Sequence, residues 1–168
     1  MALYQYGDFA TDPWRMLPDG EAIGAKGALI LPLARWRAER AALAARDGDT
    51  GVAIKAGEVF EDVIPDLTAL PLIALNFAKY TDGRAFSLAR DLRERSGYKG
   101  DIRATGDVLL DEMALMLRCG FTSFDISDER TVRALRRGPL PAVSLFYQPA
   151  LGVEAPAGTR PWLRRRPG

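Results

Sequence analysis

The chain has 168 residues, a length that fits one domain. Its 23 Lys and Arg residues nearly balance 22 Asp and Glu residues, which argues against generic binding to nucleic acids or to anionic membranes. It has no His and a single Cys, so it lacks the commonest metal ligand and can build neither an internal disulfide nor a Cys-rich metal site. We therefore expect no metal site and no tightly bound cofactor.

The first segment, residues 1–21, mixes aromatic residues with Pro, Asp and Gly. This mixture predicts an irregular or hairpin-like arm whose aromatic side chains cover one edge of the core. The segment lacks the basic start and long apolar run of a secretory signal. No apolar stretch reaches the roughly 20 residues that a membrane-spanning helix needs. We expect a cytoplasmic protein.

Strands and helices alternate after this arm. Short apolar runs predict strands at 27–33, 51–56, 70–77, 101–104, 123–127 and 142–147. Composition and apolar spacing predict helices at 34–45, 84–95, 107–118 and 129–137, with a weak helix or loop at 58–67. Such alternation is typical of βα units with right-handed crossovers and a mostly parallel sheet.

These elements predict one α/β domain over residues 1–148. We expect three layers, with a mostly parallel sheet of five to six strands and helices on both faces. A partial barrel of βα units is the alternative, and we favour the open arrangement because a complete barrel takes about 250 residues. The remaining residues, 149–168, are rich in Pro, Gly and Arg and predict a flexible basic tail.

The most informative polar segment is 76–84, which follows the strongest predicted strand and opens a helix. Open α/β sheets bind ligands at such strand ends. Asn76 and Arg84 are candidate ligands of a small oxyanion. Because the chain has no His, Lys79 and Tyr80 are the candidates for proton transfer, together with Asp82. In the plainer interpretation, Asp82 caps the helix and the two basic side chains are solvated.

A second polar segment, 103–107, also joins a strand to a helix. Thr105 can cap that helix, and the free N–H groups at the helix start, with Arg103, can bind an anion. Asp107 argues against an anion there, because it already places a carboxylate at the helix start, but it is a further candidate for catalysis. Capping alone also explains the segment. Gln148, after the last predicted strand, would join the same edge as a ligand.

Several separated blocks carry a family resemblance. They are Asp-Gly-Arg-Ala-Phe-Ser-Leu-Ala-Arg at 82–90, Gly-Tyr-Lys-Gly at 97–100, Arg-Ala-Thr-Gly-Asp-Val-Leu at 103–109, Arg-Cys-Gly-Phe at 118–121 and Phe-Tyr-Gln at 146–148. In this order they resemble a bacterial family of unknown function whose members are described as oxidoreductases involved in sulfite reduction. Genes of that family lie beside genes of assimilatory sulfate reduction. The resemblance covers about residues 70–148 well and the first 70 residues loosely.

The resemblance implies a role in sulfur assimilation, for which two functions fit. The first is an accessory protein of sulfite reduction without a tightly bound cofactor, whose partner would be sulfite reductase or its electron donor. The alternative is an oxidoreductase or other small-molecule enzyme that acts on a small oxyanion such as sulfite at the strand-end loops.

Overall fold

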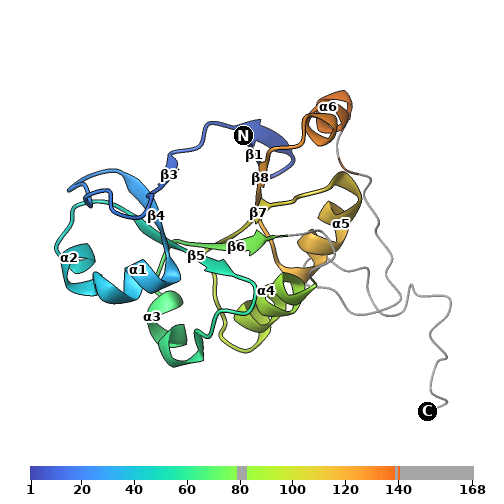
Figure 1. Cartoon of the computed structure of the whole chain (residues 1–168). Coiled ribbons are helices and arrows are strands. Elements are labelled where there is room, and N and C mark those ends of the chain that lie inside the picture. Colours follow the sequence, from blue (N-terminus) through green and yellow to red (C-terminus); the bar gives the residue numbers. More distant parts are fainter. Residues whose placement is uncertain (79–82, 139, 141–168) are drawn as a thin grey trace, which may run out of the picture.

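We describe residues 1–78, 83–138 and 140 of a computed structural model (Figure 1). The sequence predictions for Lys79, Tyr80, Asp82, Gln148, the strand at 142–147 and the tail lie outside the described residues.

The described part of the chain forms one sheet of eight strands rather than the five to six that were predicted. Its strands are β1 (Ala2–Gln5), β2 (Asp8–Ala10), β3 (Trp14–Met16), β4 (Ala28–Pro32), β5 (Thr50–Lys55), β6 (Leu72–Phe77), β7 (Asp101–Gly106) and β8 (Ser123–Ile126). They lie side by side in the order β2-β1-β8-β7-β6-β5-β4-β3. Neighbours from β3 to β8 pair in parallel, whereas β1 pairs antiparallel with both β8 and β2.

The additional strands come from the segment that was predicted as an arm. β1 and β2 form a hairpin whose two loop residues, Tyr6 and Gly7, have φ angles of 54° and 89°. Two positive φ angles are what a two-residue type I′ turn requires. β3 instead joins the opposite edge of the sheet, beside β4. The hairpin-like part of the prediction thus fits β1 and β2, and a third strand was missed.

The helices are α1 (Leu33–Ala38), α2 (Arg40–Ala44), α3 (Ile64–Leu67), α4 (Arg84–Glu94), α5 (Leu110–Cys119) and α6 (Glu129–Arg137), with a 3-10 turn at Glu61–Val63. Figure 1 shows them along the outer, convex side of a curled sheet. The predicted placement of helices on both faces is therefore wrong, and the partial-barrel alternative fits. From β4 to β8 each strand lies beside the next in sequence, so right-handed crossovers that all advance in one direction place every helix on one face.

The curl of the sheet follows from one short connection. β2 and β3 lie at opposite ends of the strand order, yet only residues 11–13 separate them in sequence. Four residue steps of extended chain span at most about 14 Å. The two edges must therefore approach each other, and the sheet must bend into a half-barrel.

Alternation along the strands gives the two faces of this half-barrel different cores. Ile73, Leu75 and Phe77 of β6 belong to the large core under the helices. On the other face Leu72 and Ala74 form a small separate cluster, which includes Ile30 and is covered in part by Trp14 and Ala53. Above this cluster, toward the carboxyl ends of the strands, the concave face becomes polar.

Candidate functional site

Three polar side chains lie at one level of the concave face, where β5, β6 and β7 end. Lys55 is paired in register with Asn76, and Asn76 with Thr105. The Asn76 side-chain amide donates a hydrogen bond of 3.4 Å to the Thr105 hydroxyl. Lys55 is exposed, Asn76 is half-buried and Thr105 is 8% exposed. The exposure of the three side chains to solvent therefore decreases from Lys55 through Asn76 to Thr105.

Arg84 brings a second cation to this edge. It is the first residue of α4, and its guanidinium lies against Gly57 in the loop after β5: a Cβ atom added to Gly57 would stand 2.7 Å from Nη1 of Arg84. Gly57 also has a φ of +88°, which favours glycine. In the same loop a carboxylate oxygen of Glu58 accepts a hydrogen bond of 2.6 Å from the backbone N–H of Lys55, which fixes the end of β5.

The segment after β7 differs from its prediction. α5 begins at Leu110, not at 107, and Thr105 lies within β7, where its hydroxyl donates to the Leu75 carbonyl at 3.4 Å. Thr105 therefore does not cap the helix. The Asp107 N–H is also occupied, because it donates to the Phe77 carbonyl at 2.9 Å. A tight turn here replaces the predicted helix start, so the predicted set of free N–H groups beside Thr105 is not formed.

Arg103 lies on the same concave face, two residues before Thr105, and is 3% exposed. Its guanidinium contacts Asp12 at 2.8 Å and Asp101 at 3.7 Å, and it donates to the Ser123 hydroxyl at 3.3 Å. Asp12 belongs to the connection between β2 and β3, so this ion pair fastens the connection to the middle of the sheet. Arg103 thus has carboxylate partners, and its predicted role as an oxyanion ligand stays a prediction.

The half-buried Asp125 adds a third carboxylate to this group of charges around Arg103. Burial raises the pKa of Asp125, Arg103 opposes that rise, and Asp12 adds to it. The cluster holds more negative than positive charge, so it is suited to fastening the sheet rather than to receiving an anion.

The structure brings Asn76 and Thr105 into contact and places Arg84 at the same edge, in line with their common prediction as ligands. Sequence reasoning missed Lys55. Its position could have been inferred, because it is the polar residue at the carboxyl end of the predicted strand 51–56, as Asn76 is for the strand 70–77. Together Lys55, Arg84 and Asn76 supply ammonium, guanidinium and amide donors, which suits a small anion with several acceptor oxygens, and the Thr105 hydroxyl holds the Asn76 amide.

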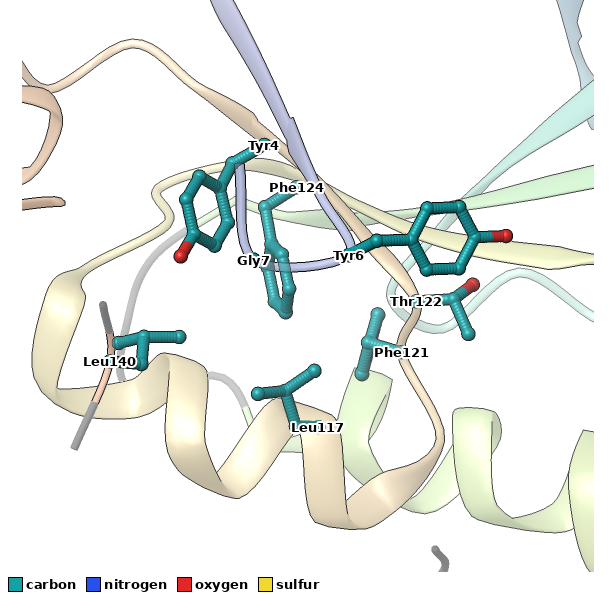
Figure 2. A pocket seen from close by; sticks show the side chains of 8 residues that line it. All are labelled: Tyr4, Tyr6, Gly7, Leu117, Phe121, Thr122, Phe124 and Leu140. Carbon is teal, nitrogen blue, oxygen red and sulfur yellow. The ribbon is translucent and has the colours of Figure 1, made fainter. Parts of the chain in front are cut away.

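A separate cavity of about 310 Å³ opens on the convex side of the sheet. Figure 2 shows Leu117 of α5 and Phe124 of β8 approaching it from opposite sides. Its other lining residues are Tyr4, Tyr6, Gly7, Phe121, Thr122 and Leu140. The lining is almost entirely apolar, and the Thr122 hydroxyl is bonded to Asp101 at 2.5 Å. This cavity offers little to an oxyanion.

The described residues also bear on two other kinds of site, a metal site and a nucleophilic thiol. No three His, Cys, Asp or Glu side chains among them are placed to hold a metal ion. Burial raises the pKa of the Cys119 thiol, which keeps it in the less nucleophilic protonated form. Within the same residues, no helix has both the length and the apolar character needed to cross a membrane.

Fold and site together define an α/β half-barrel with a cationic, donor-rich edge at the carboxyl ends of its parallel strands. The chain belongs to the family described as "Bacterial protein of unknown function (DUF934)", whose model matches residues 51–158. This match confirms the resemblance to an uncharacterised bacterial family, and the description states no reaction. No curated protein and no solved structure matches the chain.

Proposed function

We propose that this protein binds a small oxyanion of the sulfite class at the carboxyl edge of β5, β6 and β7. We further propose that it serves sulfite reduction as an accessory protein without a tightly bound cofactor of its own. The geometry of the edge supports binding of an anion, and the sequence blocks that resemble a family involved in sulfite reduction support the accessory role.

The observation that carries the anion site is the common level of Lys55, Asn76 and Thr105 on the concave face. Active sites of barrels built from βα units lie at the carboxyl ends of the strands, and this set lies at the corresponding place. Lys55 forms no ion pair with any described carboxylate. Its ammonium group can therefore meet an anion without first losing such a partner.

The charge of the ligand follows from the donors. An ammonium and a guanidinium together favour an anion. The Asn76 amide has a second N–H, besides the one that donates to Thr105, which can donate to a further oxygen atom. Sulfite offers three oxygens in a small volume, which is consistent with a site that has three donor side chains, Lys55, Arg84 and Asn76.

The role in sulfite reduction is supported by the resemblance of the blocks between residues 82 and 148. The absence of His and the single Cys in the sequence support an accessory protein rather than a carrier of haem or an iron–sulfur cluster. Its partner would be sulfite reductase or its electron donor.

Isothermal titration of the full chain with sulfite, sulfate and chloride tests the anion site. We expect sulfite to bind, and Lys55→Met and Arg84→Ala each to weaken binding by about tenfold or more, since a hydrogen bond to a charged group contributes about 1.5–3 kcal/mol. Lys99→Met is the matched control, because Lys99 is exposed just before β7, at the opposite end of the sheet. Absence of sulfite heat, or equal binding by Lys55→Met and wild type, would contradict the proposal.

A growth experiment tests the pathway. A deletion strain of the source bacterium should fail on sulfate and on sulfite as sulfur source and should grow on cysteine. The wild-type gene should restore growth, whereas the Lys55→Met gene should not. Equal growth of the deletion strain on all three sources would remove the role in sulfite reduction and leave the anion site to be judged by titration.

A further inference from the structure

Helix α6 carries arginines that differ from most of the other arginines in the described part of the chain. Arg130, Arg133, Arg136 and Arg137 are all exposed. No carboxylate in the described ranges forms an ion pair with any of them, whereas such pairs hold Arg15, Arg35, Arg37, Arg40, Arg90, Arg95 and Arg103. Figure 1 shows α6 at the outer end of the arc, beyond β8. The helix therefore presents concentrated positive charge at the periphery of the molecule.

Two of these arginines line a groove of about 380 Å³ between α6 and the end of β8. Ile126 and Val132 give the groove an apolar part, and Arg133 and Arg136 give it a cationic part, with Ser127 also in its wall. A surface of this kind fits a peptide segment that carries carboxylates together with apolar side chains.

The guanidinium groups in the groove contact an aromatic ring and a backbone carbonyl, and neither contact neutralises their positive charge. Arg136 lies 5.5 Å from the centre of the Phe9 ring, and Nε of Arg133 donates to the Glu129 carbonyl at 3.2 Å. Each guanidinium has five N–H donors, so both retain donors for a partner. Restricting the side chains before binding lowers the entropy lost when a partner docks.

The groove also lies at the carboxyl end of a parallel strand of the sheet. Ile126 ends β8 and Ser127 follows it, and β8 is parallel to β7. The groove is therefore at the same carboxyl edge as Lys55, Asn76 and Thr105. A protein docked against α6 would lie along the edge that carries the candidate anion site.

We propose that α6 and the groove beside it, lined by Ile126, Ser127, Val132, Arg133 and Arg136, bind an acidic segment of a partner protein. A protein is favoured over a nucleic acid for two reasons. The whole chain has a formal net charge of only +1, and the groove places the apolar side chains of Ile126 and Val132 beside its arginines, which suits the apolar side chains of a peptide better than a phosphate backbone. Glu129 also lines the groove, and the two arginines outweigh its single negative charge. This surface acts whether or not the edge binds sulfite.

The test measures fluorescence anisotropy of a labelled oligoglutamate peptide with the full chain at physiological ionic strength. Arg133→Gln/Arg136→Gln should weaken binding by about tenfold or more, because close charge pairs contribute strongly to such interfaces. Lys26→Gln/Lys99→Gln removes the same charge from exposed sites elsewhere and should change binding by less than about twofold. Ser127→Glu places a carboxylate in the wall without altering either arginine and should also weaken binding, which guards against misfolding of the double variant.

Three results would overturn the proposal. They are absence of peptide binding by wild type, equal weakening by the arginine pair and the lysine pair, and tighter binding of a single-stranded DNA that the arginine pair abolishes. The first result would mean that the surface binds no acidic peptide. The second would mean that binding depends only on the net charge of the protein, and the third that the surface binds nucleic acid. Sulfite titration of the same variants distinguishes this surface from the anion site, because the Arg133→Gln/Arg136→Gln variant should bind sulfite as the wild type does.

Discussion

At the scale of single residues, Gly106 shows how closely the carboxyl ends of β6 and β7 approach each other. Its φ is +87°, and a Cβ atom at this position would stand 2.3 Å from the Phe77 carbonyl oxygen and 2.9 Å from the Asn76 side-chain nitrogen. Both the backbone angle and the space therefore require glycine, which fixes the end of β7 and with it the neighbouring Thr105.

We expect Gly106→Ala to lower the free energy of unfolding by at least about 2 kcal/mol, from backbone strain and displacement of Phe77. Gly83→Ala is the matched control: Gly83 has a φ of −71° and no atom within 4 Å of an added Cβ, so alanine should change stability by less than about 1 kcal/mol. Urea unfolding of both variants measures the difference. Similar losses in the two would show that the β6–β7 end is less tightly packed than described.

Asp125 gives a pH-dependent prediction. Because burial raises its pKa, the folded protein keeps this proton to a higher pH than the unfolded chain does. The stability associated with Asp125 is then lost as the pH rises from the unfolded pKa through the folded one, and the ionised carboxylate destabilises the fold at neutral pH. Asp125→Asn should therefore raise the free energy of unfolding at neutral pH and give no gain at an acidic pH where the carboxyl is protonated in both states.

Urea unfolding at the two pH values measures this effect, with Asp47→Asn in an exposed turn as control. A loss of stability at neutral pH in Asp125→Asn would mean that attraction to Arg103 outweighs burial, and the account of the carboxylate cluster would be wrong.

At the scale of elements, Arg93 joins the end of α4 to two other segments. Its guanidinium donates to the carbonyls of Tyr98 and Gly100 at 2.8 Å and to that of Gly120 at 2.9 Å, and it lies 5.4 Å from the centre of the Tyr98 ring. Tyr98, Gly100 and Gly120 all belong to blocks that carry the family resemblance. A Cβ atom at Gly100 would stand 2.8 Å from the Pro71 carbonyl oxygen, and Gly120 has a φ of 102°, so the fold itself favours glycine at these two positions of the blocks.

Arg93→Lys keeps the positive charge but loses the planar guanidinium group and with it most of the hydrogen bonds to the three carbonyls. We expect it to lower the free energy of unfolding by about 2–3 kcal/mol. Arg90→Lys on the same helix affects only an exposed ion pair with Glu94 and should cost less than about 1 kcal/mol. Thermal unfolding followed by circular dichroism compares the two variants. Equal unfolding midpoints for the two variants would show that the hydrogen bonds of Arg93 do not stabilise the packing of α4.

The elements also show which parts of the fold could be predicted from the sequence. The strands β4 to β8 were predicted because buried parallel strands appear as short apolar runs. β3 was missed because it is only three residues long and lies at an edge with two of them exposed. The capping role given to Thr105 failed because its hydroxyl is used by the neighbouring strand, a tertiary contact that local pattern does not reveal.

For the molecule as a whole, the order in which the strands pair determines whether the sheet is open or forms a partial barrel, and the local sequence pattern does not reveal that order. The sequence predicted βα units, but the choice between open layers and a partial barrel depends on whether successive strands always lie side by side. The order from β4 to β8 answers that question, and the short connection between β2 and β3 adds the curl. The candidate site was predicted in part for the same reason: Asn76, Arg84 and Thr105 follow from strand ends, whereas Lys55 becomes evident once β5 lies beside β6.

Binding of a small oxyanion at the edge formed by Lys55, Asn76 and Thr105 can be observed residue by residue. Titration of isotope-labelled protein with sulfite, followed by proton–nitrogen correlation spectra, tests it most directly. We expect saturable shifts of the Asn76 side-chain amide signals and of the backbone N–H signals of Lys55 and Thr105, and no shift of the Lys99 N–H signal. Unmoved Asn76 signals at saturating sulfite, or shifts confined to α6, would contradict the account.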